Sequence, residues 1–348
     1  NSLIPLYNQG QFKEVINHIS QIEPNGPESE LILNLQGAAF LAIKQYDDAI
    51  ACFKNAIKIA PKFPDAHNNL GNVYKSKGDL PKAIESFRQA TAIDPNYADA
   101  FFNLGVCFNI TESFQEAAES FKRATVINPN YAEAFYRLGI VLQDMERLKE
   151  AETSYRQAIK IKPENYKAHY NLGICMKELG KLDEAESSFS TVIDLKPDYA
   201  EGYVGLGNVM KEQGKLDEAV TVWKKAFSIK PNFSEAYIIL GNFYLSQNKF
   251  DKAIDFFKGA ININPHLAEA YNNLGIALQA SGNYKEAISQ YQKALSFKKN
   301  YAEAFTNLGN CLMSLGIIDD SISNHICALN LQPDNDKIFN NLFYPLKV

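Results

Sequence analysis

The 5 histidines of this sequence, a residue type common in catalysis and metal binding, are scattered along the chain. The sequence contains no His-Glu-x-x-His motif, no serine-centred nucleophile elbow and no glycine-rich phosphate loop. His67 and His169 occupy a recurring bulky position, which favours packing over metal ligation. The same position elsewhere holds Phe101, Phe135, Tyr203 and Tyr271. We therefore expect no catalytic residue, no metal site and no cofactor.

The cysteines predict neither disulfides nor a metal site. The chain has 5 cysteines and no Cys-x-x-Cys pair. Cys107, Cys175 and Cys311 stand at one recurring position, where a small buried apolar side chain is expected. Unpaired cysteines suit a reducing compartment, so we expect a cytoplasmic protein.

Composition argues against two classes of partner. The net charge of −5 does not favour nucleic acid, because phosphate binding requires a basic face. No apolar run approaches the roughly 20 residues that a membrane-spanning helix needs. The first residues, 1–11, do not combine a basic region with an apolar run, so we expect no intact signal peptide there.

The elements that position these residues come from one repeated unit. Glycine recurs every 34 residues nine times, at Gly37, Gly71, Gly105, Gly139, Gly173, Gly207, Gly241, Gly275 and Gly309. Proline has the same period at Pro61, Pro95, Pro129, Pro163, Pro197, Pro231 and Pro265, then yields to Lys299 and returns at Pro333. A fixed period of this length predicts a solenoid.

Each unit predicts two amphipathic helices. In residues 64–97 the first helix carries apolar and small residues at helical spacing, and Gly78 follows it where a left-handed cap is favoured. The second helix carries Ala83 and Phe87, and Pro95 ends it. We expect Gly71 at the crossing of the two helices and Phe87 against the next hairpin. One hairpin cannot bury its apolar face alone, so neighbouring hairpins must stack.

This pattern of a bulky residue, Leu-Gly, an aromatic residue, then Ala, an aromatic residue, Ala and Pro resembles the tetratricopeptide repeat. The resemblance implies an all-α fold, a right-handed superhelical solenoid of antiparallel helix hairpins whose first helices line the inner surface. Residues 1–29 are expected to form a partial repeat or cap, and 336–348 to begin a tenth repeat or a C-terminal cap. Nine repeats are expected between them, at 30–63, 64–97, 98–131, 132–165, 166–199, 200–233, 234–267, 268–301 and 302–335.

A ladder of asparagines precedes the Leu-Gly pair in most units. Its members are Asn69, Asn103, Asn171, Asn273, Asn307 and Asn341, whereas Arg137 is one of the exceptions. An asparagine amide both donates and accepts hydrogen bonds, so a ladder of them suits the backbone of an extended peptide. The ladder is similar to that of the O-linked N-acetylglucosamine transferases, which implies recognition of extended protein segments. The alternative is that each asparagine bonds to the neighbouring hairpin.

The neighbouring positions change character along the array. Units three to five are expected to present an apolar floor made of Phe102, Val106, Tyr136, Ile140, Tyr170 and Ile174. Asparagines flank this floor at Asn72, Asn208, Asn242 and Asn310. We interpret the arrangement as a central hydrophobic pocket with polar ends that hold a peptide backbone. The alternative is that the aromatic rings are buried against adjacent helices.

The leading hypothesis is a protein or peptide-binding scaffold without catalytic activity. The first alternative is the substrate-recognition arm of a larger glycosyltransferase- or sulfotransferase-type enzyme. The second is self-association into a homo-oligomer. A third, a clamp for a C-terminal carboxylate such as some family members carry, would use Arg137 and Lys167, but the lysine that precedes the asparagine position in such clamps is absent.

Overall fold

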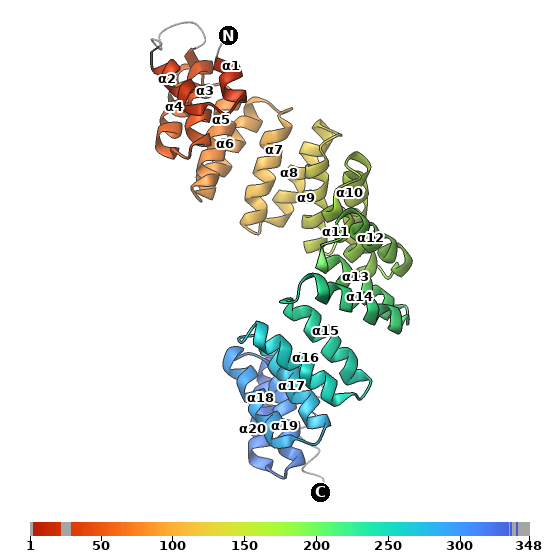
Figure 1. Ribbon diagram of the computed structural model, residues 1–348. Coiled ribbons are helices and arrows are strands. Elements are labelled where there is room, and N and C mark those ends of the chain that lie inside the picture. The colour runs from red at the N-terminus through yellow and green to blue at the C-terminus, as the bar shows by residue number, and fades with distance from the viewer. Residues whose placement is uncertain (1–2, 22–28, 334, 336–338, 340–348) are drawn as a thin grey trace. The chain divides into compact units, whose positions relative to one another are not determined.

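The computed structural model describes residues 3–21, 29–333, 335 and 339, and these fold into twenty α-helices without a strand (Figure 1). In chain order the helices are α1 Leu3–Asn8, α2 Phe12–Ser20, α3 Ser29–Ala42, α4 Tyr46–Ile59, α5 Pro64–Ser76, α6 Leu80–Ile93, α7 Ala98–Ile110, α8 Phe114–Ile127, α9 Ala132–Asp144, α10 Leu148–Ile161, α11 Tyr166–Glu178, α12 Leu182–Leu195, α13 Ala200–Glu212, α14 Leu216–Ile229, α15 Ser234–Ser246, α16 Phe250–Ile263, α17 Ala268–Ala280, α18 Tyr284–Phe297, α19 Ala302–Ser314 and α20 Ile318–Leu331.

The chain divides into two compact units, Asn1–Thr191 and Val192–Val348. Within each unit, consecutive helices pack as hairpins, for example α5 with α6 and α17 with α18, and each hairpin packs on the next. The expected all-α solenoid of antiparallel helix hairpins is therefore confirmed. The limits of the individual repeats remain predictions, and the expected tenth repeat at 336–348 lies outside the described residues apart from Phe339.

The recurring glycine makes room for the recurring aromatic ring. A Cβ on Gly37 would lie 2.7 Å from the ring of Phe53, so only glycine lets this ring lie against the first helix of its own hairpin. The same ring belongs to a buried cluster with Leu70 and Val73 of the following hairpin. One aromatic side chain thus contacts both helices of its own hairpin and the next hairpin of the stack. This shared packing explains why the glycine and the aromatic residue both recur every 34 residues.

The turn inside each hairpin has a fixed backbone conformation. Gly78 has φ of 80°, the left-handed conformation expected of a helix cap. The same register has positive φ at Gly10, Gly180, Gly214, Gly282 and Gly316, and also at the non-glycine residues Lys44, Glu112, Glu146 and Asn248. A side chain strains this conformation, so four of the turns carry a local cost that glycine would remove.

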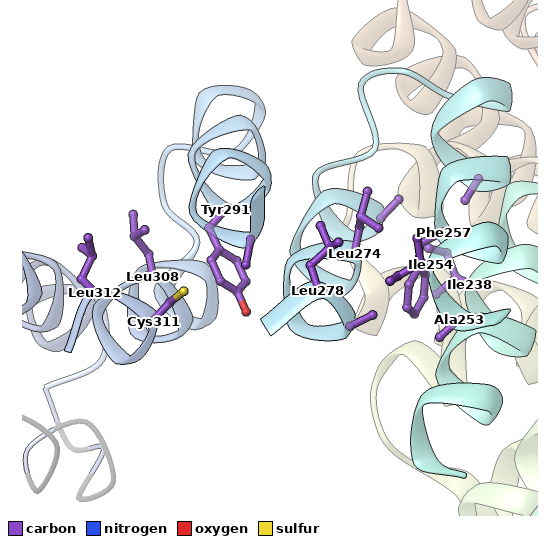
Figure 2. Close-up of a cluster of buried hydrophobic side chains, with 14 residues drawn as sticks. Ile238, Ala253, Ile254, Phe257, Leu274, Leu278, Tyr291, Leu308, Cys311 and Leu312 are labelled. Carbon is purple, nitrogen blue, oxygen red and sulfur yellow. The ribbon is translucent and has the colours of Figure 1, made fainter. Parts of the chain in front are cut away.

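The core of the second unit is built in layers that follow the chain. Figure 2 shows Ile254 and Phe257 of α16, then Leu274 and Leu278 of α17, then Tyr291 of α18 and finally side chains of α19, all in one buried cluster. Each layer fills the space between two hairpins. No single hairpin holds a closed core, so the unit is stable only as a stack.

Two buried tyrosine hydroxyls, one in each unit, have hydrogen-bond partners. Tyr155 Oη donates to Gln143 Oε1 at 2.9 Å, and Tyr291 Oη donates to Gln279 Oε1 at 2.8 Å. Both glutamines stand twelve residues before their tyrosine, on the first helix of the same hairpin. A buried hydroxyl without such an acceptor would lose its hydrogen bonds to water, so the pairing offsets that cost.

Candidate functional site

In both units the first helices of successive hairpins lie close together. Helix α5 contacts α3 and α7, and α17 contacts α15 and α19, whereas no two successive second helices of the described chain pack to the same extent. A stack that is tighter on one side is concave on that side. We call the surface formed by α3, α5, α7, α9 and α11 in one unit, and by α13, α15, α17 and α19 in the other, the first-helix face.

In the first unit the predicted asparagines bond to the preceding hairpin. Asn69 Nδ2 donates to Asn34 Oδ1 at 3.0 Å. Asn103 Nδ2 donates in the same way to Asn68 Oδ1 at 3.1 Å. The ladder therefore ties neighbouring hairpins together, as its alternative interpretation expected.

Each of these bonds uses one of the two N–H donors of the amide, and other side chains join the same network. Asn171 Nδ2 donates to the hydroxyl oxygen of Tyr136 at 3.3 Å, so a tyrosine can replace asparagine as the acceptor. Asn103 Oδ1 accepts from Lys75 Nζ at 2.9 Å. Burial lowers the pKa of Lys75, whose Nζ also lies 5.6 Å from the ring centroid of Phe87. The amide groups are thus held in fixed orientations.

In the second unit four asparagines form one continuous chain of amides. Asn307 Nδ2 donates to Asn272 Oδ1 at 3.0 Å, and Asn272 Nδ2 donates to Asn273 Oδ1 at 3.3 Å. Asn273 Nδ2 donates in turn to Asn242 Oδ1 at 3.1 Å. Asn272 is fully buried and Asn273 is 8% exposed, whereas Asn242 is exposed. The buried amides therefore orient the exposed amide of Asn242.

The chain of hydrogen-bonded amides changes direction at Asn273 because of the residue that precedes it in the neighbouring hairpin. Other ladder asparagines donate to the side chain 35 residues earlier. For Asn273 that position holds the buried Ile238, whose side chain has no hydrogen-bond acceptor. Asn273 reaches Asn242 instead, one helical turn further along α15. Its amide is thereby directed toward the exposed part of the first-helix face.

The predicted aromatic floor in the first unit is only partly open. Phe102, Tyr136 and Tyr170 are half-buried. Each contacts the core ring of its own hairpin, with centroid distances of 5.6 Å to Phe121, 6.3 Å to Tyr155 and 5.6 Å to Phe189. The three rings therefore contribute to the core and remain partly exposed.

The aliphatic part of the floor, Val106, Ile140 and Ile174, is half-buried in the same way. Phe102 also stacks on Tyr131 at 5.1 Å between centroids, which links it to the next hairpin. Both interpretations of the floor thus describe part of the observed arrangement, and its role in binding stays a prediction.

The remaining predicted residues have more local surroundings. Arg137 Nε donates to Glu133 Oε1 at 2.7 Å, and its guanidinium lies 5.9 Å from the ring centroid of Tyr136. This pairing engages the guanidinium that a carboxylate clamp would need. Asn72, Asn208 and Asn310 are half-buried on the first-helix face.

A cavity of about 730 Å³ opens on the first-helix face of the second unit. Two predicted residues, Asn242 and Asn273, line it. Its wall also includes Glu269, Lys298, Tyr301 and Glu303. Burial raises the pKa of Tyr301 to about 12, and the nearby carboxylates of Glu303 and Glu269 act in the same direction.

Sequence reasoning did not select these additional wall residues. Glu269 and Glu303 belong to an acidic register at the start of the first helices, where a negative charge complements the helix dipole. The substitution of the periodic proline by Lys299 marks the loop beside Lys298 as unusual, and this was the only available signal.

The described residues contain no group of three or more histidine, cysteine or acidic side chains arranged to hold a metal ion. None of their helices is both long enough and apolar enough to cross a membrane. Cys52, Cys107, Cys175, Cys311 and Cys327 are free thiols.

Protein-family models match most of the chain. A model described as TPR repeat matches residues 37–78, 71–109, 110–146 and 207–247. Two models described as tetratricopeptide repeat match residues 142–209 and 232–300. Together these matches cover residues 37–300 without a gap. This range includes the glycines that lie under an aromatic ring from Gly37 to Gly275.

A curated relative is the probable UDP-N-acetylglucosamine–peptide N-acetylglucosaminyltransferase SEC of Arabidopsis thaliana, 33% identical over 78 residues. That match covers 22% of this chain and 8% of the transferase. The solved structure of YrrB, described as a TPR protein with an unusual peptide-binding site, has a TM-score of 0.50 at 26% identity and covers 53% of this chain and 95% of YrrB.

A second solved structure, the APC/C hetero-tetramer Cut9–Hcn1, is similar in fold alone. Its TM-score is 0.56 at 14% identity, over 98% of this chain and 82% of that one. The family models, the helix hairpins and the ring-over-glycine packing agree with one another. The chain belongs to the tetratricopeptide repeat family.

Proposed function

We propose that the first-helix face binds an extended segment of another protein, which makes this chain a peptide-binding scaffold. A protein-interaction role is typical of tetratricopeptide repeats, and the proposal adds the surface and the form of the ligand. The observation that carries it is the chain of amides that runs from Asn307 to the exposed Asn242 and ends at the 730 Å³ cavity.

An extended peptide offers backbone donors and acceptors at regular intervals and no secondary structure of its own. Asn242 donates no hydrogen bond within the described part of the chain, so its Nδ2 remains for a peptide carbonyl. Because buried amides hold Asn242 in place, little side-chain entropy is lost when it binds. The face can therefore hold a backbone with limited dependence on ligand sequence.

Half-exposed apolar side chains supply a second kind of contact. Ile140 and the edges of Tyr136 and Tyr170 lie on the first-helix face of the first unit. The two tyrosine rings contact the core rings of Tyr155 and Phe189, which limits their freedom, and aromatic groups held in this way are favoured as binding anchors. The peptide-binding site named in the description of YrrB supports the same kind of function.

Substrate recognition for a larger glycosyltransferase-type enzyme is the second candidate function. The 78-residue match to the Arabidopsis transferase supports it. In that case the same face would bind the segment of the substrate protein. A glycosyltransferase assay on the full-length protein, with a peptide that binds this face, would then detect transfer of a sugar to the peptide.

The proposal is tested by panning a phage-displayed library of random dodecapeptides on the purified chain and synthesising the tightest-binding peptide. Calorimetry then compares the wild type with Asn242→Ala and Ile140→Ala. Each contact of this kind contributes about 1 kcal/mol, so we expect affinity to fall about fivefold for each variant whose residue the peptide contacts.

Lys122→Ala and Glu218→Ala are matched controls, because both residues are exposed on second helices. They should leave affinity unchanged. The proposal is overturned if panning selects no peptide. It is also overturned if the affinity of the selected peptide depends on Lys122 or Glu218 and on neither Asn242 nor Ile140.

A further inference from the structure

In several hairpins the acidic residue at the start of the first helix has a hydrogen-bond or ion-pair partner within the chain. Tyr97 Oη donates to Asp65 Oδ1 at 2.7 Å. Arg137 pairs with Glu133 as described above, and Lys230 Nζ pairs with Glu201 Oε1 at 2.8 Å. In these repeats the chain itself supplies a donor or a cation to the carboxylate.

Glu269 and Glu303, like Glu235, differ from Glu133 and Glu201 in having no cation of the described residues bound to the carboxylate. Within the described part of the chain neither Glu269 nor Glu303 forms an ion pair, and Glu303 only accepts a 3.3 Å hydrogen bond from Asn272. Lys298 stands 29 residues after Glu269, as Lys230 does after Glu201, yet its Nζ lies over the ring of Tyr301 at 4.5 Å and closes no such bridge.

The helix dipole does not explain this difference. Each acidic residue of the register lies in the first turn of its helix and receives the same support from the helix N-terminus, whether or not it is paired. What distinguishes Glu269 and Glu303 is that both line one cavity, together with the oriented amide of Asn242. The ring of Tyr301 lines the same cavity, and both carboxylates add to the effect of burial in raising the pKa of its hydroxyl.

We propose that this cavity binds the basic side chain of a lysine or arginine in the extended segment, between the carboxylates of Glu269 and Glu303. The inference rests on the proposed function and adds a sequence preference to it. The two carboxylates outnumber the single cation of the wall, Lys298, so a ligand cation completes the charge balance of the cavity. Asn242 at the edge of the cavity then holds the adjacent peptide carbonyl.

The peptide selected from the dodecapeptide library is the probe. It is synthesised a second time with each arginine replaced by citrulline, or each lysine by norleucine, which removes the charge and keeps the aliphatic part of the side chain. The two forms are titrated into the wild type and into the double variant Glu269→Gln/Glu303→Gln. Glu235→Gln is the matched control, because Glu235 has the same register on α15 and does not line the cavity.

We expect the charged peptide to bind the wild type and Glu235→Gln about three- to tenfold more tightly than the neutral form, with equal affinity of both forms for the double variant. Circular dichroism confirms that the variants remain folded. Glutamine removes the charge at constant size on exposed residues, so unfolding is not expected.

The two proposals fail in different ways. Selected peptides that bind the first-helix face but show no charge preference, or keep it in the double variant, overturn the inference and leave the proposed function intact. Failure to select any peptide overturns the proposed function, and the inference with it.

Discussion

His325 should make the last hairpin sensitive to mild acid. It occupies the position that carries a phenylalanine, tyrosine or tryptophan in the other eight hairpins, and its ring lies about 2.8 Å from where a Cβ on Gly309 would be. The side chain is 1% exposed, and its Nδ1 has no hydrogen-bond partner among the described residues. Burial therefore lowers the pKa of His325 below its ordinary value of 6.5.

The sign and size of the effect follow from linkage. Well above pH 6.5 the imidazole is neutral in both the folded and the unfolded chain, and stability is at its full value. Below that pH the unfolded chain takes up a proton that the folded hairpin excludes, so the free energy of unfolding decreases as the pH falls toward the lowered pKa. The decrease is at most about 1.4 kcal/mol per pH unit.

The assay is pulse proteolysis of the last hairpin between about pH 7.5 and about pH 5.5, with the peptides read by mass spectrometry. His325→Phe should remove this acid-dependent loss and raise stability at neutral pH. His266→Phe is the control, because it removes an exposed histidine and leaves the buried one. Equal acid sensitivity of wild type and His325→Phe would refute the reasoning.

Three further predictions concern the packing that holds the hairpins together, and each is measured by urea unfolding followed with circular dichroism and hydrogen exchange. Tyr155→Phe should lower the free energy of unfolding by about 1 kcal/mol, and a double-mutant cycle with Gln143→Leu should give a coupling energy of similar size. Additive effects of the two substitutions would contradict the buried hydrogen bond. Gly139→Ala should destabilise by about 1–3 kcal/mol, because its Cβ would lie 2.5 Å from the Tyr155 ring; a smaller loss would mean that the ring moves aside easily. Glu112→Gly and Glu146→Gly should each stabilise by about 0.5–1 kcal/mol by relieving φ values of 57° and 59°, and an unchanged or lowered midpoint would show that these turns are not strained.

The fold was predictable because its physical causes repeat with the sequence. Glycine must lie under an aromatic ring in each hairpin, so these two residue types recur every 34 residues. A left-handed residue follows each first helix with the same period, and it is a glycine in some hairpins and another residue in the rest. The expected cap at Gly78 is confirmed by its φ of 80°. A uniform period contains no signal for a division of the chain, and so the two compact units were not foreseen.

The candidate site was only partly predictable, because side-chain direction depends on the neighbouring repeat. The asparagine ladder was identified from spacing, but the partner of Asn273 follows from the apolar Ile238 of the preceding hairpin. The cavity brings together Glu269 and Glu303, which belong to successive hairpins. This arrangement is invisible in a register whose members all look alike in sequence.

The central claim is that the first-helix face holds the ligand, and photo-crosslinking tests it most directly. The selected dodecapeptide, carrying benzoylphenylalanine at successive positions, is irradiated with the wild-type chain, and the crosslinked residues are identified by mass spectrometry. The account predicts crosslinks to first helices, at residues such as Ile140 of α9 and Asn242 of α15. Crosslinks confined to second helices such as α8 and α10 would contradict it.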